Sequence, residues 1–151
     1  MVYRNGISAL TASALTLAVL WQTPTRADDA AIDTTIETMA EYLMFQDYQS
    51  GIIMPQQIDQ SIFEAVKFID TRTAEDYAAA TIPGASHIEW REVFDRIDDI
   101  PEDQKTILFC NTGALSAQAV FALRVAGRDN VLVLQGGFAG WQANAAYQPQ
   151  E

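Results

Sequence analysis

The chain has 151 residues, of which 49% are hydrophobic, and it carries 20 acidic against 9 basic side chains. This length and apolar content suit one globular domain with a hydrophobic core and exclude a second full domain. The net charge of −11 argues against nucleic acids and anionic lipids as main partners, because both are themselves negatively charged.

The first 27 residues differ from the rest of the chain. Arg4 precedes an uncharged stretch over residues 5–25, and Thr25 and Ala27 occupy the small-residue positions of an export cleavage site. We therefore predict a signal peptide over residues 1–27 and a periplasmic or secreted mature protein with a net charge of −13. The apolar core of this stretch is shorter than the about 20 residues of a membrane span, so we expect no stable membrane anchor after cleavage.

Residues 28–50 are acidic, and apolar side chains recur in them at helical spacing: Ile36, Met39, Ala40, Leu43 and Met44. The spacing predicts an N-terminal helical extension that packs on the main domain through this apolar stripe. The main domain is expected over residues 51–151. Near its start, Pro55 suits a first helical turn, and a helical face follows with Ile58, Ile62 and Phe63.

Three short apolar runs predict strands: "VKFID" (66–70), "TILFC" (106–110) and "VLVL" (131–134). Segments compatible with helices separate them, which indicates an α/β fold with a mainly parallel central sheet flanked by helices. In such sheets the chemistry gathers beyond the carboxyl ends of the strands, where Asp70 and Cys110 both fall.

Cys110 is the chain's only cysteine. An exported protein with one cysteine forms no internal disulfide, so this thiol is reactive, pairs with another molecule, or is a small buried hydrophobe. A tight loop with Gly113 follows, and then a helical pattern that Gly127 can stop. Backbone N–H groups converge in front of such a helix and form an anion-binding site, which lowers the pKa of a thiol there and makes it nucleophilic.

Four motifs in order resemble the signatures of the rhodanese family: "FIDTRTAEDY", "TIPGASHI", the Cys110 loop with Gly113 and Ser116, and "VLVLQGGFAGW". The resemblance covers about residues 55–141. It implies a single rhodanese-like domain whose active loop runs from Cys110 to Leu115. It also implies sulfur transfer, in which Cys110 takes the outer sulfur of a donor such as thiosulfate and passes it to cyanide or a thiol.

The resemblance assigns further roles around the catalytic Cys110. Backbone N–H groups of the loop are expected to hold the anionic donor and the persulfide: Asn111, Thr112, Gly113, Ala114, Leu115 and Ser116. Asp70 and Arg72 are expected to brace the loop through hydrogen bonds, and Gly136 and Gly137 to permit a tight turn beside it. No metal or organic cofactor is required. The sequence names no protein partner.

The loop departs from many rhodanese-like loops because it contains no cation. We infer weaker binding of a small dianion such as thiosulfate, and a preference for a larger or less charged donor, with Leu115 in the position of an arginine. His87 has no cysteine or histidine at metal-ligand spacing, so it is expected to be a packed or surface residue. Arg124, in the helix after the loop, is expected to be solvated.

Three other functions compete with the enzyme. Phosphatases related to this fold place an arginine six residues after the cysteine, where this chain has Ser116, so phosphoryl transfer is disfavoured. Disulfide exchange is disfavoured by the missing second cysteine. A non-catalytic rhodanese-like module, which binds a protein or relays sulfur with it, stays open as the main alternative.

Overall fold

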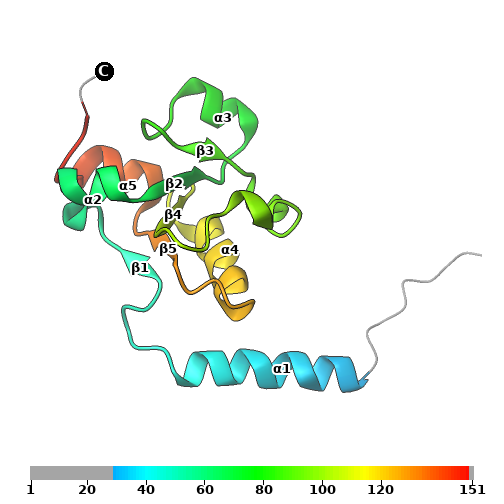
Figure 1. Ribbon diagram of the computed structural model, residues 1–151. Helices are drawn as coiled ribbons and strands as arrows, with labels where there is room; N and C mark the ends of the chain where they lie inside the picture. The colour runs from blue at the N-terminus through cyan, green and yellow to red at the C-terminus, as the bar shows by residue number, and fades with distance from the viewer. Residues whose placement is uncertain (1–28, 150–151) are drawn as a thin grey trace, which may run out of the picture.

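The computed structural model describes residues 29–149, and the predicted signal peptide lies outside the described residues (Figure 1). One parallel sheet has the strand order β1-β5-β4-β2-β3. Its strands are β1 (Ile52–Ile53), β2 (Lys67–Asp70), β3 (Ser86–His87), β4 (Thr106–Phe109) and β5 (Val131–Leu134). The prediction of an α/β fold with a parallel central sheet is confirmed.

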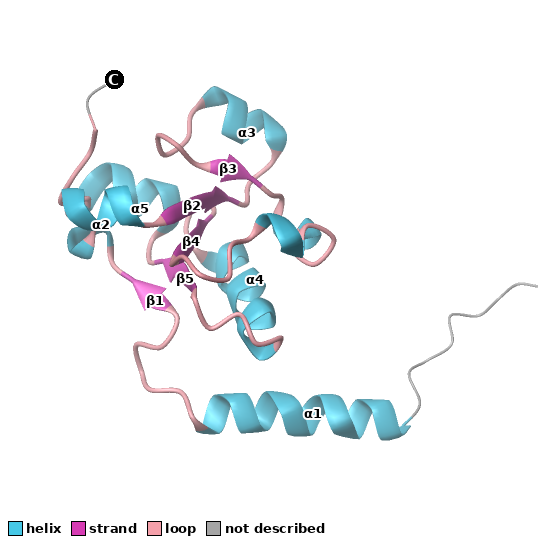
Figure 2. Ribbon diagram, in the orientation of Figure 1, coloured by secondary structure: helices cyan, strands magenta, loops and turns pink. Residues whose placement is uncertain are grey.

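Helices cover both faces of this sheet (Figure 2). The helices of the described chain are α1 (Asp29–Met44), α2 (Gln60–Ala65), α3 (Ala74–Ala79), α4 (Ala114–Val125) and α5 (Gly137–Asn144), with short 3₁₀ turns η1 (Pro55–Gln57), η2 (Trp90–Glu92) and η3 (Ile97–Asp99). None of the helices in the described part of the chain is long and apolar enough to cross a membrane.

The strands alternate their side chains between two apolar layers, as a sheet buried on both faces requires. In β4, Ile107 and Phe109 join one layer with Phe138 and Trp141 of α5. Leu108 joins the opposite layer, together with side chains of α4: Ala119, Val120 and Leu123. The sheet is therefore held between α2 and α5 on one side and α4 on the other.

Because all strands run in one direction, their carboxyl ends meet at one edge of the sheet. β2 and β4 are direct neighbours, with Asp70 opposite Phe109. The Thr71 N–H donates to the Phe109 carbonyl at 2.8 Å, so the pairing continues one residue beyond β2. This register sets the segment from Asp70 to Arg72 beside the Cys110 loop.

Helix α1 exists as predicted, but the prediction that its apolar stripe packs on the domain is wrong. No residue of α1 is buried, and Ile36 and Leu43 are each 59% exposed. Arg124 also corrects the sequence analysis, since its side chain is only 10% exposed. Its Nε donates to the Tyr42 hydroxyl at 2.8 Å, and the Tyr42 ring meets Phe121 edge-on, so α1 contacts α4 through Tyr42 and not through the predicted stripe.

Candidate active site

Cys110 follows β4 directly and lies in front of the N-terminus of α4. Gly113 caps the helix with a φ of 92°, a left-handed conformation that glycine adopts without steric cost. The first helical bond of α4 joins the Ala117 N–H to the Gly113 carbonyl at 2.9 Å. The N–H groups before Ala117 have no helical acceptor, so they are available to the Cys110 sulfur.

Hydrogen bonds to this sulfur lower the pKa of Cys110. Burial acts in the opposite direction and is the largest single effect, because a charged thiolate is poorly solvated there. It is outweighed by the Ser116 N–H and hydroxyl together with the N–H groups of Thr112 and Leu115. The Ser116 hydroxyl lies 3.7 Å from Cys110 Sγ and is fully buried. The arrangement favours the thiolate form.

Backbone hydrogen bonds from helix α5 fix the Cys110 loop. The Phe138 N–H donates to the Cys110 carbonyl at 2.8 Å, and the Ala139 N–H donates to the Asn111 carbonyl at 3.1 Å. With these carbonyls bonded to α5, the loop turns its N–H groups toward the sulfur. Gly137 allows this contact, because a Cβ built on it would lie 2.3 Å from the Cys110 carbonyl oxygen.

A buried ion pair lies beside the loop. Arg72 Nη2 contacts Asp70 Oδ2 at 2.6 Å, and the two side chains are 6% and 0% exposed. Asp70 also accepts a hydrogen bond from the Thr81 hydroxyl at 2.8 Å. Arg72 reaches the loop through Asn111 Oδ1 at 3.4 Å and lies over the Phe138 ring, 4.5 Å from its centroid. The pair thus links β2 to both the Cys110 loop and α5.

A hollow of about 460 Å³ opens in front of Cys110. Its walls come from the loop, from the residues after β2 and from η2: Thr71, Arg72, Thr73, Asp76, Glu89, Trp90, Arg91, Cys110, Asn111, Thr112 and Leu115. Leu115 is 41% exposed on its rim. A small anion can therefore approach the sulfur from this side.

Sequence reasoning missed Arg91, which lines the hollow as a cation from outside the loop. Its guanidinium is 73% exposed, and Nε donates to both carboxylate oxygens of Glu89 at 3.1 Å. Nothing in the spacing to Cys110 points to it, because only the fold brings η2 to the loop. Sequence reasoning also gave Ser116 a backbone role alone, whereas its hydroxyl reaches the sulfur as well.

His87 is a partly buried, packed residue, as expected. Its Nε2 lies 2.7 Å from the Arg72 carbonyl oxygen, and its ring stacks on Tyr77 with centroids 5.0 Å apart. Within residues 29–149, no group of three or more histidine, cysteine or acidic side chains is arranged to hold a metal ion.

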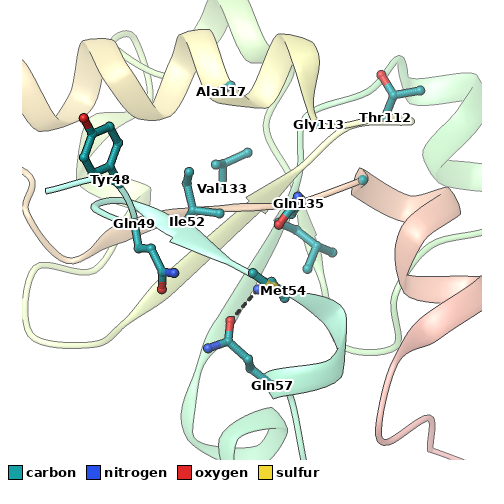
Figure 3. Close-up of a pocket in the computed structure, with 12 residues that line it drawn as sticks. Tyr48, Gln49, Ile52, Met54, Gln57, Thr112, Gly113, Ala117, Val133 and Gln135 are labelled. Atoms are coloured by element: carbon teal, nitrogen blue, oxygen red, sulfur yellow. Dashed lines mark hydrogen bonds between the residues drawn. The ribbon is translucent and has the colours of Figure 1, made fainter.

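A second hollow of about 410 Å³ adjoins the loop at Thr112 and Gly113 without including Cys110 (Figure 3). Apolar side chains of β1 and β5 line it, and its polar side chains are those of Tyr48, Gln49, Gln57, Thr112 and Gln135. Gln57 accepts a hydrogen bond from the Met54 N–H at 2.8 Å, drawn as a dashed line in Figure 3. It contains no charged side chain, so the anion chemistry belongs to the hollow at Cys110.

The fold and the loop together define a class: a parallel α/β domain with one cysteine at a helix N-terminus, whose pKa is lowered by hydrogen-bond donors of the loop. The family model for the rhodanese-like domain matches residues 54–144. The chain belongs to the rhodanese-like domain family.

Comparisons with individual proteins agree with this assignment. The chain is 35% identical over 78 residues to a sulfurtransferase of Allochromatium vinosum, a match that covers 52% of this chain and 73% of the relative. It is 33% identical over 91 residues to the thiosulfate sulfurtransferase GlpE of Pseudomonas entomophila, covering 60% and 84%. A rhodanese-related protein of Thermoplasma volcanium shares the fold with a TM-score of 0.58 at 22% identity, covering 66% of this chain and 98% of that one.

Proposed function

We propose that this protein is a sulfurtransferase that carries sulfane sulfur on Cys110, from a donor such as thiosulfate to a thiol or cyanide. The observation that carries the proposal is the hydrogen-bonded sulfur of Cys110, whose pKa is lowered by donors from Thr112, Leu115 and Ser116. A buried structural cysteine has no need of such donors. Relatives named as sulfurtransferases support the same reaction.

The first step forms the persulfide. The Cys110 thiolate attacks the outer sulfur of thiosulfate, the sulfur–sulfur bond of the donor breaks, and sulfite leaves with the electron pair. The loop amides that stabilise the thiolate also stabilise the terminal sulfur of the persulfide, because both carry negative charge. Arg91 lines the same hollow and adds a cation for the donor that the loop itself does not supply.

The second step returns the enzyme to its starting state. A thiolate or cyanide attacks the outer sulfur of the persulfide, the bond to Cys110 breaks, and Cys110 leaves as a thiolate. Electrons and atoms balance without an outside oxidant or reductant. In this scheme the buried Asp70–Arg72 pair is a positioning element, because the Arg72 guanidinium is engaged by Asp70 and holds Asn111 and α5 in place.

Intact-mass measurement after incubation with thiosulfate tests the proposal. We expect the protein to gain the mass of one sulfur atom, cyanide to remove it, and the Cys110→Ser variant to gain nothing. Unchanged mass with thiosulfate, organic thiosulfonates and polysulfide would overturn the enzyme and favour the non-catalytic binding module.

A further inference from the structure

An apolar groove of about 750 Å³ lies between α1, α4 and the η2 region. Its lining includes Met39 of α1, Phe121 and Val125 of α4, and Trp90 and Phe94 from the η2 region. Phe94 is 50% exposed. Large apolar side chains gathered in one exposed depression are typical of a surface that a partner covers.

Polar contacts near one end of α1 set its position beside this groove. Arg124 donates to the Tyr42 hydroxyl at 2.8 Å and to Gln46 Oε1 at 3.2 Å. The Tyr42 ring meets Phe121 edge-on, with centroids 5.7 Å apart. Tyr42 lies in the C-terminal half of α1, and Gln46 lies in the turn after it. Figure 1 shows the helix extending from there to one side of the domain.

Helix α1 carries an apolar stripe, adjoining the groove at Met39, that the rest of the described chain leaves unburied. Ile32, Ile36, Met39 and Leu43 recur at helical spacing and share one face. Ile36 and Leu43 are each more than half exposed. A helix of this length gains most of its stability from burial of its apolar face, which the domain alone does not provide here.

A row of four carboxylates runs beside this stripe. The acids follow one another at four-residue spacing: Asp29, Asp33, Glu37 and Glu41. Like charges at this spacing destabilise a helix by a few tenths of a kcal/mol per pair, and α1 contains no basic residue to offset them. No ion pair among the described residues involves any of the four.

The acidic row on α1 indicates which kind of partner fits the groove. A second copy of this chain would bring two acidic rows together, and an anionic lipid surface would be repelled in the same way. A helix with apolar residues on one face and lysines or arginines beside them matches both the stripe and the acidic row.

The groove also adjoins the active site. Trp90 lines both the groove and the hollow in front of Cys110. A protein seated against α1 and α4 therefore lies next to the mouth through which an acceptor must reach the persulfide.

We propose that the groove and α1 bind a basic amphipathic helix of a partner protein, and that this partner is the thiol that accepts the sulfur. The second half rests on the proposed function, while the first half does not. In the transfer, the partner's cysteine thiolate attacks the outer sulfur of the Cys110 persulfide. The bond to Cys110 breaks, and the partner leaves as a persulfide.

Fluorescence anisotropy with a designed peptide tests the docking. The probe is a labelled Leu/Lys amphipathic helix of about 18 residues, and a Leu/Glu peptide with the same apolar pattern is its control. We expect the parent protein to bind the Leu/Lys peptide and not the Leu/Glu peptide. The Leu/Lys peptide should bind at least tenfold more weakly to the Glu37→Lys/Glu41→Lys variant, and also more weakly to the Ile36→Ser/Leu43→Ser variant. Cys110→Ser should bind as the parent does, since docking needs no sulfur chemistry.

A matched control tests whether the peptide binds at the groove or is attracted by the net negative charge of the whole protein. Glu64→Lys/Glu75→Lys makes the same charge change at exposed positions on α2 and α3, away from the groove, and should keep the affinity within about twofold. An equal loss in this control, or equal binding of the Leu/Glu peptide, would overturn the proposal. So would a dimer in sedimentation that Leu43→Ser dissociates, since the occupant would then be a second copy.

Sulfur transfer tests the acceptor half. Each peptide carries one cysteine near its end, and the protein is first loaded with thiosulfate. We expect the Leu/Lys peptide to take the sulfur at least tenfold faster than the Leu/Glu peptide, with the preference lost in Glu37→Lys/Glu41→Lys. Equal rates would overturn the acceptor role. If the protein forms no persulfide with thiosulfate, both the proposed function and the acceptor role are overturned. The anisotropy measurement still tests the docking.

Discussion

The Ser116 hydroxyl is a single polar group that bears on the ionisation of Cys110. It lies 3.7 Å from Cys110 Sγ and 3.1 Å from the Gly113 carbonyl oxygen, and its proton is shared between these two acceptors. When the sulfur is charged it is the stronger acceptor, because hydrogen bonds to charged groups contribute about twice as much as neutral ones.

Removing this hydroxyl should make Cys110 less reactive near neutral pH. In the native protein the lowered pKa of Cys110 extends the reactive range to lower pH, and reactivity is lost as pH falls through that pKa. Ser116→Ala removes a donor to the charged form, so the pKa rises and the loss begins at higher pH. At about 1.5 kcal/mol for such a bond, alkylation by iodoacetamide near pH 7 should slow up to about tenfold.

The control for this measurement is Ser61→Ala. It removes an exposed hydroxyl of α2 that donates a hydrogen bond to Asp59, away from Cys110. Its alkylation profile should match the parent. A Ser116→Ala profile that also matches the parent would mean that the backbone amides alone set the pKa of Cys110.

Arg91 should govern the affinity for anionic donors. Because the loop contains no cation and Arg72 is buried in its ion pair with Asp70, the exposed guanidinium of Arg91 is the group at the hollow that distinguishes a dianion from a neutral donor. We expect Arg91→Gln to raise KM for thiosulfate about three- to tenfold with a smaller change in kcat, and Leu115→Arg to lower KM. Arg96→Gln is the matched control, since Arg96 pairs with Asp99 outside the hollow. Equal KM values for Arg91→Gln and the parent would contradict the assignment.

At the scale of elements, the contact between α5 and the Cys110 loop depends on Gly137. Its φ of 58° costs an alanine about 1–2 kcal/mol, and the added Cβ would lie 2.3 Å from the Cys110 carbonyl oxygen and 2.7 Å from the Gly113 nitrogen. Gly137→Ala should therefore displace the loop, lower the melting temperature, and abolish persulfide formation as measured by intact mass.

Gly127→Ala is the control that introduces the backbone strain of a positive φ without a steric contact with the Cys110 loop. Its φ of 93° is also left-handed, but a Cβ there meets no atom within 4 Å. This variant should lose only about 1–2 kcal/mol of stability and keep persulfide formation. If the two alanine variants lose activity to the same extent, the close approach of α5 to the loop is not what holds the site.

The same elements show what the sequence reveals and what it conceals. The central strands and the Cys110 loop were predictable because their signals are local: apolar runs for β2, β4 and β5, and a cysteine and a glycine before a helix. β1 and β3 have only two residues each, too few for a period to be detected.

Contacts between distant residues were not predictable. Arg124 was expected in solvent but bonds Tyr42, 82 positions earlier in the chain. Arg91 reaches the active site because the segment after β3 bonds to the end of β2, which in turn pairs with β4. The stripe on α1 was recognised correctly as apolar, yet its burial was wrongly expected, because periodicity shows that a helix has a face to cover and not what covers it.

At the scale of the whole molecule, the net charge of −11 opposes a dianionic donor. The negative field repels thiosulfate over distances comparable with the Debye length, about 30 Å at 0.01 M salt and about 10 Å at 0.1 M. Near the sulfur, Arg91 and the loop amides attract the same ion over a few ångströms, where salt screens less. Repulsion at long range and attraction at short range therefore respond differently to ionic strength.

Raising sodium chloride from about 0.01 M to about 0.3 M should increase kcat/KM for thiosulfate several-fold, because salt screens the long-range repulsion first. A monoanionic aromatic thiosulfonate should gain less, since the repulsion scales with donor charge. Arg91→Gln, with the local attraction reduced, should show a steeper rise than the parent. A fall in kcat/KM with salt for the parent would mean that the cation at the hollow outweighs the charge of the whole chain, and would contradict this balance.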